Sequence, residues 1–408
     1  MHLPSLIRTL GRDLRERHGA RVHKIALDAG FTCPNRDGSR GIGGCTFCNN
    51  SSFSPNGRQP RPVAEQLAAG RAVIRRRTGA RRYLAYFQAY SNTYSDVASL
   101  QALYDAALAE PDVIGLSVGT RPDCVPAPVL DLLAGYRDAG REVWLELGLQ
   151  SADDATLARV NRGHGFAEYR HAALAARRRG LRLCTHLMVG LPGEPPAASL
   201  DTLRRVLDLG TDGLKLHPLH VVKGTALAND WRRGTYQALA FEDYVETAAA
   251  LIEQTPPEVV YHRLTGTASA EILLAPAWCA QKWRVLNAIA AELVARGTCQ
   301  GAALGRRLDA VTPTRPDQDD ERLVVDPADG GGQPSAPART RREYPSASGW
   351  ARPSPSGPGR SPGCEGPPDL RSRFTPVGSY AASLPHTVLA GPAGWPLTAW
   401  AARQEKPD

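Results

Sequence analysis

A repeating alternation of short apolar runs and longer amphipathic segments limits the folds open to this chain of 408 residues more than any other feature. Between residues 22 and 262, each short run is followed by a loop and then by a segment whose apolar residues recur at three- and four-residue spacing. This alternation predicts βα units whose strands form a parallel sheet. The expected strands are Val22–Leu27, Arg82–Gln88, Val113–Val118, Glu142–Leu147, Arg182–Val189, Gly213–His217 and Val259–Tyr261.

Helices are expected between these strands. Their ranges are Val63–Arg77, Val97–Ala109, Ala127–Ala139, Ala167–Arg179, Ser199–Leu209 and Phe241–Gln254. Six or seven βα units exceed a single nucleotide-binding half and fall short of an eight-fold barrel, so the residues alone leave a partial barrel and a doubly wound sheet open. In both folds, ligands bind at the carboxyl ends of the strands.

Composition divides the chain near residue 308. Residues 308–408 hold 17 of the 33 prolines, lack sustained periodicity and are rich in Gly, Ser and Arg, which predicts a disordered tail. We therefore expect an N-terminal helix over 1–20, a core over 21–265, a C-terminal extension over 266–307 and the tail. The tail has 11 basic and 12 acidic residues and thus a net charge of −1. Since the whole chain has a net charge of +8, residues 1–307 have a net charge of +9. That surplus suits an anionic partner such as nucleic acid, or serves solubility alone.

The chain has no apolar run near the roughly 18–20 residues of a membrane span, and its N-terminus lacks a secretory signal. We expect a cytoplasmic protein with no membrane partner. Eight cysteines in such a chain point to metal or cluster binding rather than to disulfides.

The strongest chemical signal is a triad of cysteines after the first expected strand, Cys33, Cys45 and Cys48, with the spacing C-x11-C-x2-C. The CxxC turn lets two sulfurs approach one metal centre, and the intervening glycines let the backbone curl so that Cys33 reaches it. One interpretation is a zinc site with Cys124 or His23 as the fourth ligand. The other is an iron–sulfur cluster with one open iron, which the lack of a second CxxC or a histidine pair nearby favours.

The order of motifs adds a resemblance. The chain contains VHKIALDAGFTCPNRDG, GGCTFCNN, RRYLAYFQAYSNTY, VGTRPDCV, VWLELGLQS, NRGH, LMVGLPGE, LKLHPLHVVKGT, PPEVVYHRLTG and LLAPAWC. This series closely resembles the bacterial YhcC/YtqA-type radical S-adenosylmethionine (SAM) family, which is similar to the radical SAM domain of the elongator catalytic subunit. The resemblance covers residues 1 to about 307. It implies an α/β fold, a partial (β/α)6 radical SAM barrel with a short C-terminal extension, followed here by the disordered tail.

The resemblance implies that Cys33, Cys45 and Cys48 hold a 4Fe-4S cluster whose open iron binds SAM. Reductive cleavage of SAM would give a radical that abstracts hydrogen from the substrate, with an electron donor such as flavodoxin or ferredoxin. Arg121 suits a bidentate contact with the SAM carboxylate, and Gln-Ala-Tyr-Ser stands where the family usually has a glycine-rich segment. The expected cofactor-binding residues are Phe47, Gln88, Thr120, Arg121, Glu146, Gln150, His186 and Met188.

The substrate side is less sharply marked, and no catalytic residue is assigned. The candidates for contact with the substrate are His217, His220 and Lys223 in the segment LHPLHVVKGT, and Tyr261, His262 and Arg263 on the last expected strand. Candidates for catalysis itself are Cys124, Cys279, Tyr261 and His262.

The preferred function is tRNA modification at the wobble uridine. It rests on the elongator-like resemblance, on the charge of +9, and on two arginine-rich runs at Arg71–Arg82 and Arg177–Arg182. Two alternatives stay open: a radical SAM enzyme acting on a small metabolite or a protein, and a non-enzymatic zinc- or cluster-binding nucleic-acid module.

Overall fold

The computed structural model describes residues 3–49, 61–306 and 308. Its main sheet has seven strands, all paired in parallel, in the order β1-β2-β3-β4-β5-β6-β8. They are β1 (Val22–Leu27), β2 (Arg82–Phe87), β3 (Val113–Thr120), β4 (Glu142–Gln150), β5 (Arg182–Val189), β6 (Gly213–Pro218) and β8 (Val260–Arg263). Because spatial order follows chain order throughout, the sheet is a partial barrel and not a doubly wound sheet. The predicted partial barrel is confirmed, and all seven expected strands are present.

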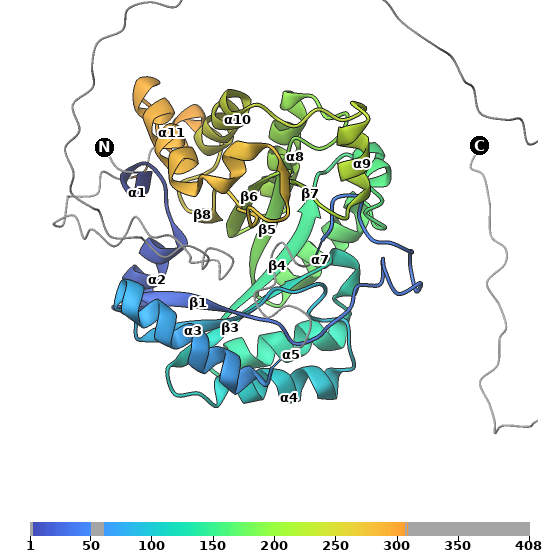
Figure 1. The fold of residues 1–408 in the computed structure, drawn as a ribbon. Helices are drawn as coiled ribbons and strands as arrows, with labels where there is room; N and C mark the ends of the chain where they lie inside the picture. Colours follow the sequence, from blue (N-terminus) through green and yellow to red (C-terminus); the bar gives the residue numbers. More distant parts are fainter. Residues whose placement is uncertain (1–2, 50–60, 307, 309–408) are drawn as a thin grey trace, which may run out of the picture. The chain divides into compact units, whose positions relative to one another are not determined.

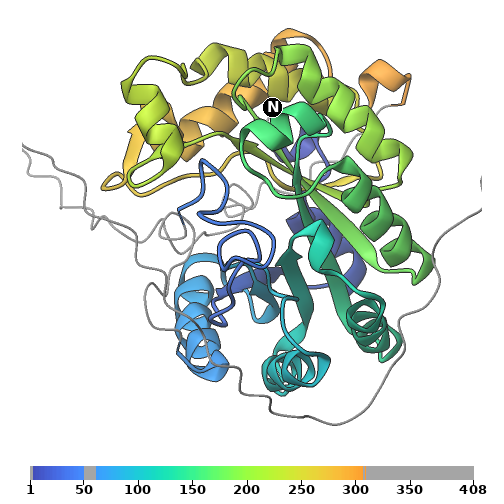
Figure 2. The same cartoon turned by 90° about the vertical axis from the view of Figure 1, so that its right-hand side faces the viewer.

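Helices cover the convex face of the sheet, as the two views in Figures 1 and 2 show. They are α3 (Val63–Thr78), α4 (Val97–Leu108), α5 (Ala127–Asp138), α7 (Phe166–Arg178), α8 (Pro196–Asp208) and α10 (Phe241–Glu253). Local signals set their ends: the Asp96 side chain accepts from the Ser99 N–H at the start of α4, and Gly79 ends α3 with a φ of 69°. Every predicted helix is present. Two short helices, α6 (Asp154–Arg159) and α9 (Ala226–Arg232), were not predicted.

The N-terminal segment packs against both edges of the curled sheet. It forms α1 (Leu3–Leu6) and α2 (Leu10–His18), so the helix predicted over 1–20 is broken at residues 7–9. At that break, the Tyr261 N–H donates to the Arg8 carbonyl at 2.8 Å, and α2 contacts both β1 and β8. Arg17 of α2 donates to the Glu142 carboxylate of β4 at 2.7 Å. These contacts cover the gap that an incomplete barrel leaves between its first and last strands.

The C-terminal extension begins with a small antiparallel sheet, formed by β7 (Val221–Val222) and β9 (Leu273–Ala275). Short 3-10 turns at Pro122–Cys124, Ala277–Ala280 and Ala302–Leu304 complete the connections, and α11 (Lys282–Ala295) packs on α10 and α1. The predicted tail beyond 308 lies outside the described residues. In the part of the chain that the structure describes, no helix has both the length and the apolar character needed to cross a membrane.

The concave face of the sheet is layered, because alternate residues of each strand point inward. Near the amino ends of the strands lies an apolar layer that contains Val22, Leu84, Trp144, Cys184 and Val260. Two residues further along each strand lies a polar layer, which contains Lys24, Tyr86, Ser117, Glu146, His186, Lys215 and His262. The polar layer is therefore sandwiched between an apolar plug and the open carboxyl end of the barrel.

Candidate active site

A cavity of about 220 Å³ opens at the carboxyl ends of the strands, where the fold predicts ligand binding. The three cysteines of the triad line it, and so do His217, His220 and Arg263. All the predicted SAM contacts line it as well, except Glu146: Phe47, Gln88, Thr120, Arg121, Gln150, His186 and Met188. One pocket thus gathers residues from the cysteine loop and from six of the seven strands.

The cysteine loop lies across the mouth of the barrel (Figure 2, blue). It is tied down by the segment after α6: the Asn35 side-chain amide donates to the Asn161 carbonyl at 2.6 Å, and the Thr46 N–H donates to the Val160 carbonyl at 3.0 Å. Gly44 has a φ of 81°, and a Cβ there would lie 2.9 Å from the Arg36 side chain. A glycine is therefore needed for the loop to place Cys45 in the pocket.

Cationic side chains face the cysteine sulfurs. Arg162 Nη1 lies 3.5 Å from Cys45 Sγ, and Arg121 Nη1 lies 4.0 Å from Cys33 Sγ. Burial, together with the neighbouring Cys45, raises the pKa of the Cys48 thiol to about 11. The two guanidinium groups would offset part of the negative charge of a thiolate-ligated cluster. The donor set fits such a group.

The zinc interpretation fits less well. Thiolate ligands of one zinc ion lie about 4 Å apart, because each Zn–S bond is about 2.3 Å. A tetrahedral zinc site would also need a fourth protein ligand in the pocket beside the three cysteines. Of the two predicted fourth ligands, Cys124 is buried outside the pocket lining, and His23 lies near the amino end of β1, where Arg21 and Arg15 are its charged neighbours.

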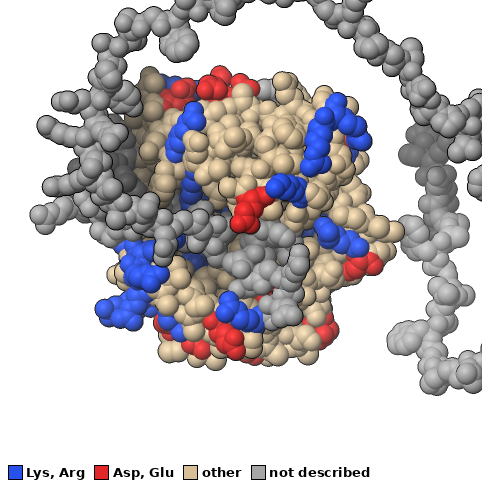
Figure 3. Space-filling model, in the orientation of Figure 1, with Lys and Arg blue, Asp and Glu red and all other residues tan. Residues whose placement is uncertain are grey.

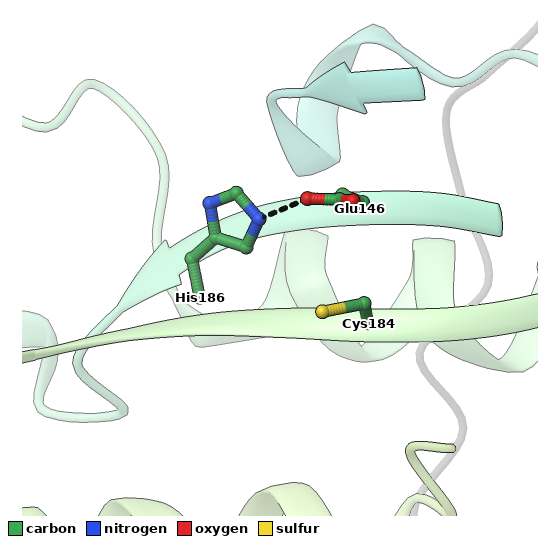
Figure 4. Close-up of side chains that lie close together, drawn as sticks. All are labelled: Glu146, Cys184 and His186. Atoms are coloured by element: carbon green, nitrogen blue, oxygen red, sulfur yellow. Dashed lines mark hydrogen bonds and ion pairs between the residues drawn. The ribbon is translucent and has the colours of Figure 1, made fainter. Parts of the chain in front are cut away.

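Glu146, Cys184 and His186 are close enough to one another to suggest a metal ion, but their charges exclude one (Figure 4). The Glu146 carboxylate is fully buried and accepts from the ammonium groups of Lys24 and Lys215. His186 Nε2 lies 2.7 Å from the same carboxylate. Since both carboxylate oxygens already face cations, a further metal ion would be repelled.

This cluster forms the floor of the pocket. Lys215 Nζ donates to the Tyr86 hydroxyl at 2.7 Å, and Lys24 Nζ lies 2.9 Å from His262 Nδ1. Burial raises the pKa of Glu146, but Lys215 and Lys24 outweigh it and hold that pKa well below its ordinary value. Burial, with repulsion from Lys24, lowers the pKa of Lys215 to about 8. At neutral pH Glu146 is therefore ionised, and Lys215 is mostly charged.

Several predicted site residues do not reach the pocket. Glu146 does not line the pocket, but its carboxylate contacts two residues that do, Lys215 and His186. His262 points inward in the polar layer but does not line the pocket, and Tyr261, its neighbour in β8, points outward and lies 2.7 Å from the Thr255 hydroxyl. Cys124 and Cys279 are buried and outside the pocket lining. These placements offer no support for direct catalytic roles.

Sequence reasoning missed the residues of the floor and the cation beside Cys45. These are Lys24, Tyr86, Arg162 and Lys215. One signal was available, because the chain has only five lysines among 49 basic residues and two of them interrupt apolar strands. Where arginine is the default cation, a lysine inside a strand marks a position whose compact ammonium group is required.

Comparison with known proteins agrees with this geometry. Residues 33–206 match the model of the radical SAM superfamily, and residues 211–295 match its C-terminal domain. Protein YhcC of Escherichia coli K12 is 52% identical over 306 residues, which cover 75% of this chain and 98% of that protein. A barrel of βα units with a cysteine triad at its open end defines a radical SAM enzyme, and this chain belongs to the radical SAM superfamily. Enzymes of this superfamily use a 4Fe-4S cluster and SAM.

Two further proteins match part of this chain. The tRNA uridine(34) acetyltransferase of Dehalococcoides mccartyi is 38% identical over 127 residues, 30% of this chain and 27% of that protein. The structure of an N-terminally truncated archaeal Elp3 from Methanocaldococcus infernus matches with a TM-score of 0.54 at 16% identity, over 68% of this chain and 64% of that chain. At this identity, the similarity to the archaeal Elp3 is a similarity of fold alone.

The two arginine-rich runs lie at the wrong end of the barrel to touch the pocket. Arg71–Arg82 spans the end of α3 and the start of β2, and Arg177–Arg182 spans the end of α7 and the start of β5. Because each helix runs back along its strand, these runs lie at the amino ends of the strands. Several of their members are already paired, as Arg71 is with Glu110. In Figure 3 the basic side chains form separate groups, one of them over α2 and the adjacent end of α3.

A different set of exposed cations lies on the cysteine loop and on the segment that follows β7. The segment after β7 contacts the cysteine loop, since the Asn49 amide donates to the Lys223 carbonyl at 2.8 Å and the Leu227 N–H donates to the Thr46 carbonyl at 2.9 Å. The exposed cations of these two segments are Arg36, Arg40, Lys223, Arg232 and Arg233.

Proposed function

We propose that this chain is a cytoplasmic radical SAM enzyme that modifies the wobble uridine of tRNA, with Cys33, Cys45 and Cys48 as the ligands of its 4Fe-4S cluster. When bound and reduced by a donor such as flavodoxin or ferredoxin, the cluster supplies reductive cleavage of SAM to methionine and a 5′-deoxyadenosyl radical. The observation that carries the proposal is the convergence of the triad, the cationic pair Arg121 and Arg162, and the SAM-facing strand ends on one pocket.

The residues of the pocket have distinct tasks in this proposal. Arg121 is fixed by Asp123, to which Nε and Nη2 donate at 2.9 and 2.8 Å, so its guanidinium stays beside Cys33. Thr120 lies 2.6 Å from the Thr93 hydroxyl, which orients it at the end of β3. Gln88, Gln150 and Met188 line the wall along which SAM would extend. Holding cofactor and substrate in one enclosed pocket directs the radical to one C–H bond.

Two observations support tRNA as the substrate. One relative, 38% identical over 127 residues, is named as a tRNA uridine(34) acetyltransferase. The exposed cations of the cysteine loop and of the segment after β7 would contact phosphates of a nucleic acid whose base enters the cavity. The arginine-rich runs at the opposite end would contact only more distant phosphates.

The test is a nucleoside profile of tRNA from a deletion strain. We expect a wobble-uridine derivative to disappear and its precursor to accumulate, with restoration by the wild-type gene and none by Cys48→Ala. Cys299→Ala is the matched control, because Cys299 lies outside the pocket lining. An unchanged profile would exclude tRNA and favour a small metabolite or a protein as the substrate.

A further inference from the structure

The walls of the pocket carry charge of one sign. The described residues that line it include Arg36, Arg121, Arg162, Lys215 and Arg263, and they include no aspartate or glutamate. Three of the five cations face the cysteine loop. Arg36 Nη1 lies 3.5 Å from the Cys48 carbonyl, and Arg121 and Arg162 lie beside cysteine sulfurs. Their negative counterpart is the thiolate triad.

The other two cations lie at the floor, on different strands. Lys215 of β6 and Arg263 of β8 are partners in the pairing register of these adjacent strands. Both line the pocket, whereas Glu146 and Lys24 lie below it. Lys215 and Arg263 therefore form a second cationic group in the same cavity, separate from the three cations beside the cysteine loop.

The carboxylate beneath the floor does not require Lys215. Lys24 alone would neutralise Glu146, and it contacts that carboxylate from a position that is 5% exposed. Lys215 shares this one carboxylate with Lys24, so the floor holds more positive than negative charge, which is costly for buried groups. The surrounding histidines add no positive charge at neutral pH. Burial lowers the pKa of His186 and of His220 to about 4. Burial also lowers the pKa of His217 and of His262 well below the ordinary value. Tyr86 and Ser117 contribute only hydroxyl groups.

We propose that the floor of the pocket is an oxyanion subsite, in which Lys215 and Arg263 hold a carboxylate or phosphate group of the substrate. The planar guanidinium can bind an oxyanion through two N–H groups, and the ammonium supplies a point charge beside it. This inference rests on the proposed function, which gives the substrate. The subsite adds that the substrate has a negatively charged group. In a modified uridine, the anion would be a carboxylate substituent or the nucleotide phosphate.

The test uses the holoenzyme labelled with 13C at the lysine ε-carbons. The chain has five lysines, so the spectrum is simple, and Lys215→Arg assigns the Lys215 signal by its loss. Sodium acetate and methyl phosphate are titrated in separate samples at an ionic strength held constant with chloride. We expect a saturable shift of the Lys215 signal with at least one of the two probes, and a rise of about one unit in its pKa, equivalent to tenfold tighter binding of the anion to the charged form.

The exposed Lys223 is the control within the same spectrum, and Lys223→Met confirms its assignment. Arg263→Gln should raise the half-saturating anion concentration about tenfold while the Lys215 signal remains readable, so the test does not depend on removing Lys215. Saturation by acetate alone would identify a carboxylate, and saturation by methyl phosphate alone a phosphate. A Lys215 signal that moves no more than that of Lys223 with either probe overturns the proposal. Since no tRNA is present, this failure and a failure of the nucleoside profile are independent.

Discussion

Individual cations in the pocket differ in function because each has a different partner. Arg162 illustrates this at the cluster end, where its Nη1 lies 3.5 Å from Cys45 Sγ and Arg121 Nη1 donates to its backbone carbonyl at 2.8 Å. Hydrogen bonds and positive charge at ligand sulfurs stabilise the reduced, more negative form of an iron–sulfur cluster. Arg162 would therefore make the cluster easier to reduce by acting on its ligand Cys45.

Arg162→Gln should lower the reduction potential of the reconstituted cluster by about 60 mV, a tenfold change in the equilibrium constant of a one-electron couple. Arg162→Lys should retain part of the wild-type potential. A redox titration followed by electron paramagnetic resonance measures the shift. Arg204→Gln is the matched control, since Arg204 is exposed and pairs with Asp201 on α8. Equal potentials for the Arg162 and Arg204 variants would contradict this role.

Glu146→Gln should destabilise the fold by about 3–5 kcal/mol, because it leaves two buried ammonium groups without their carboxylate. Lys24→Met in the same chain should recover part of that loss. Urea unfolding of the two single variants and the double variant gives the coupling energy, which we expect to exceed about 1 kcal/mol. Glu258→Gln removes a solvent-exposed pair with Arg306 and should cost less than about 1 kcal/mol. Additive effects of the Glu146 and Lys24 changes would show that the pair is not coupled.

The strands β5, β6 and β8 bring several histidines into the interior. The pKa values of His186 and His220 are lowered to about 4 by burial, with Lys215 acting on His186 and Arg263 acting on both. The unfolded chain binds these protons near pH 6.5 and the folded chain does not, so folding stability is complete above that pH and falls as the pH drops toward 4.

Each such histidine should lower the free energy of unfolding at pH 5.5 by about 1.4 kcal/mol relative to its value at pH 7.5. Urea unfolding at both pH values measures this loss. His220→Asn should make the fall shallower by about that amount, whereas His171→Asn, at an exposed position on α7, should leave it unchanged. The assignment fails if the wild type and His220→Asn lose stability equally.

Elements with strong periodicity could be predicted from the sequence, and short ones could not. The strands Val22–Leu27 and Arg182–Val189 have the predicted ends, because each is an apolar run bounded by turn residues. The two-residue strand β7 and the six-residue helix α6 are too short for a period to appear, and tertiary contacts define them. Likewise, alternation along β8 sends His262 inward and Tyr261 outward, which a list of polar residues after a strand does not reveal.

The whole described molecule is one layered half-barrel, whose polar floor separates an apolar plug from a cationic pocket. The pocket was predictable in position because parallel strands direct their carboxyl ends to one edge, and the motif residues follow those ends. The polar floor of the pocket was not predictable. Glu146 lies 122 residues after Lys24 and 69 residues before Lys215, and the three side chains meet only when the sheet curls.

Removal of residues 308–408 should leave cluster assembly and SAM cleavage unchanged. The similarity to Escherichia coli YhcC covers 306 residues and 98% of that protein, so the tail has no counterpart in the aligned region. Iron and sulfide content and the rate of 5′-deoxyadenosine formation, compared between the full and shortened chains, test this. Loss of either property in the shortened chain would assign the tail to the enzyme.

The most direct measurement is the formation of 5′-deoxyadenosine by the anaerobically reconstituted protein, supplied with SAM, a reductant and tRNA from the deletion strain. The wild-type protein should release 5′-deoxyadenosine and methionine and alter one uridine derivative in the tRNA. Cys33→Ala, Cys45→Ala and Cys48→Ala should each abolish both outcomes, and Cys299→Ala neither. A colourless protein that binds zinc through these cysteines and leaves SAM intact would contradict the account.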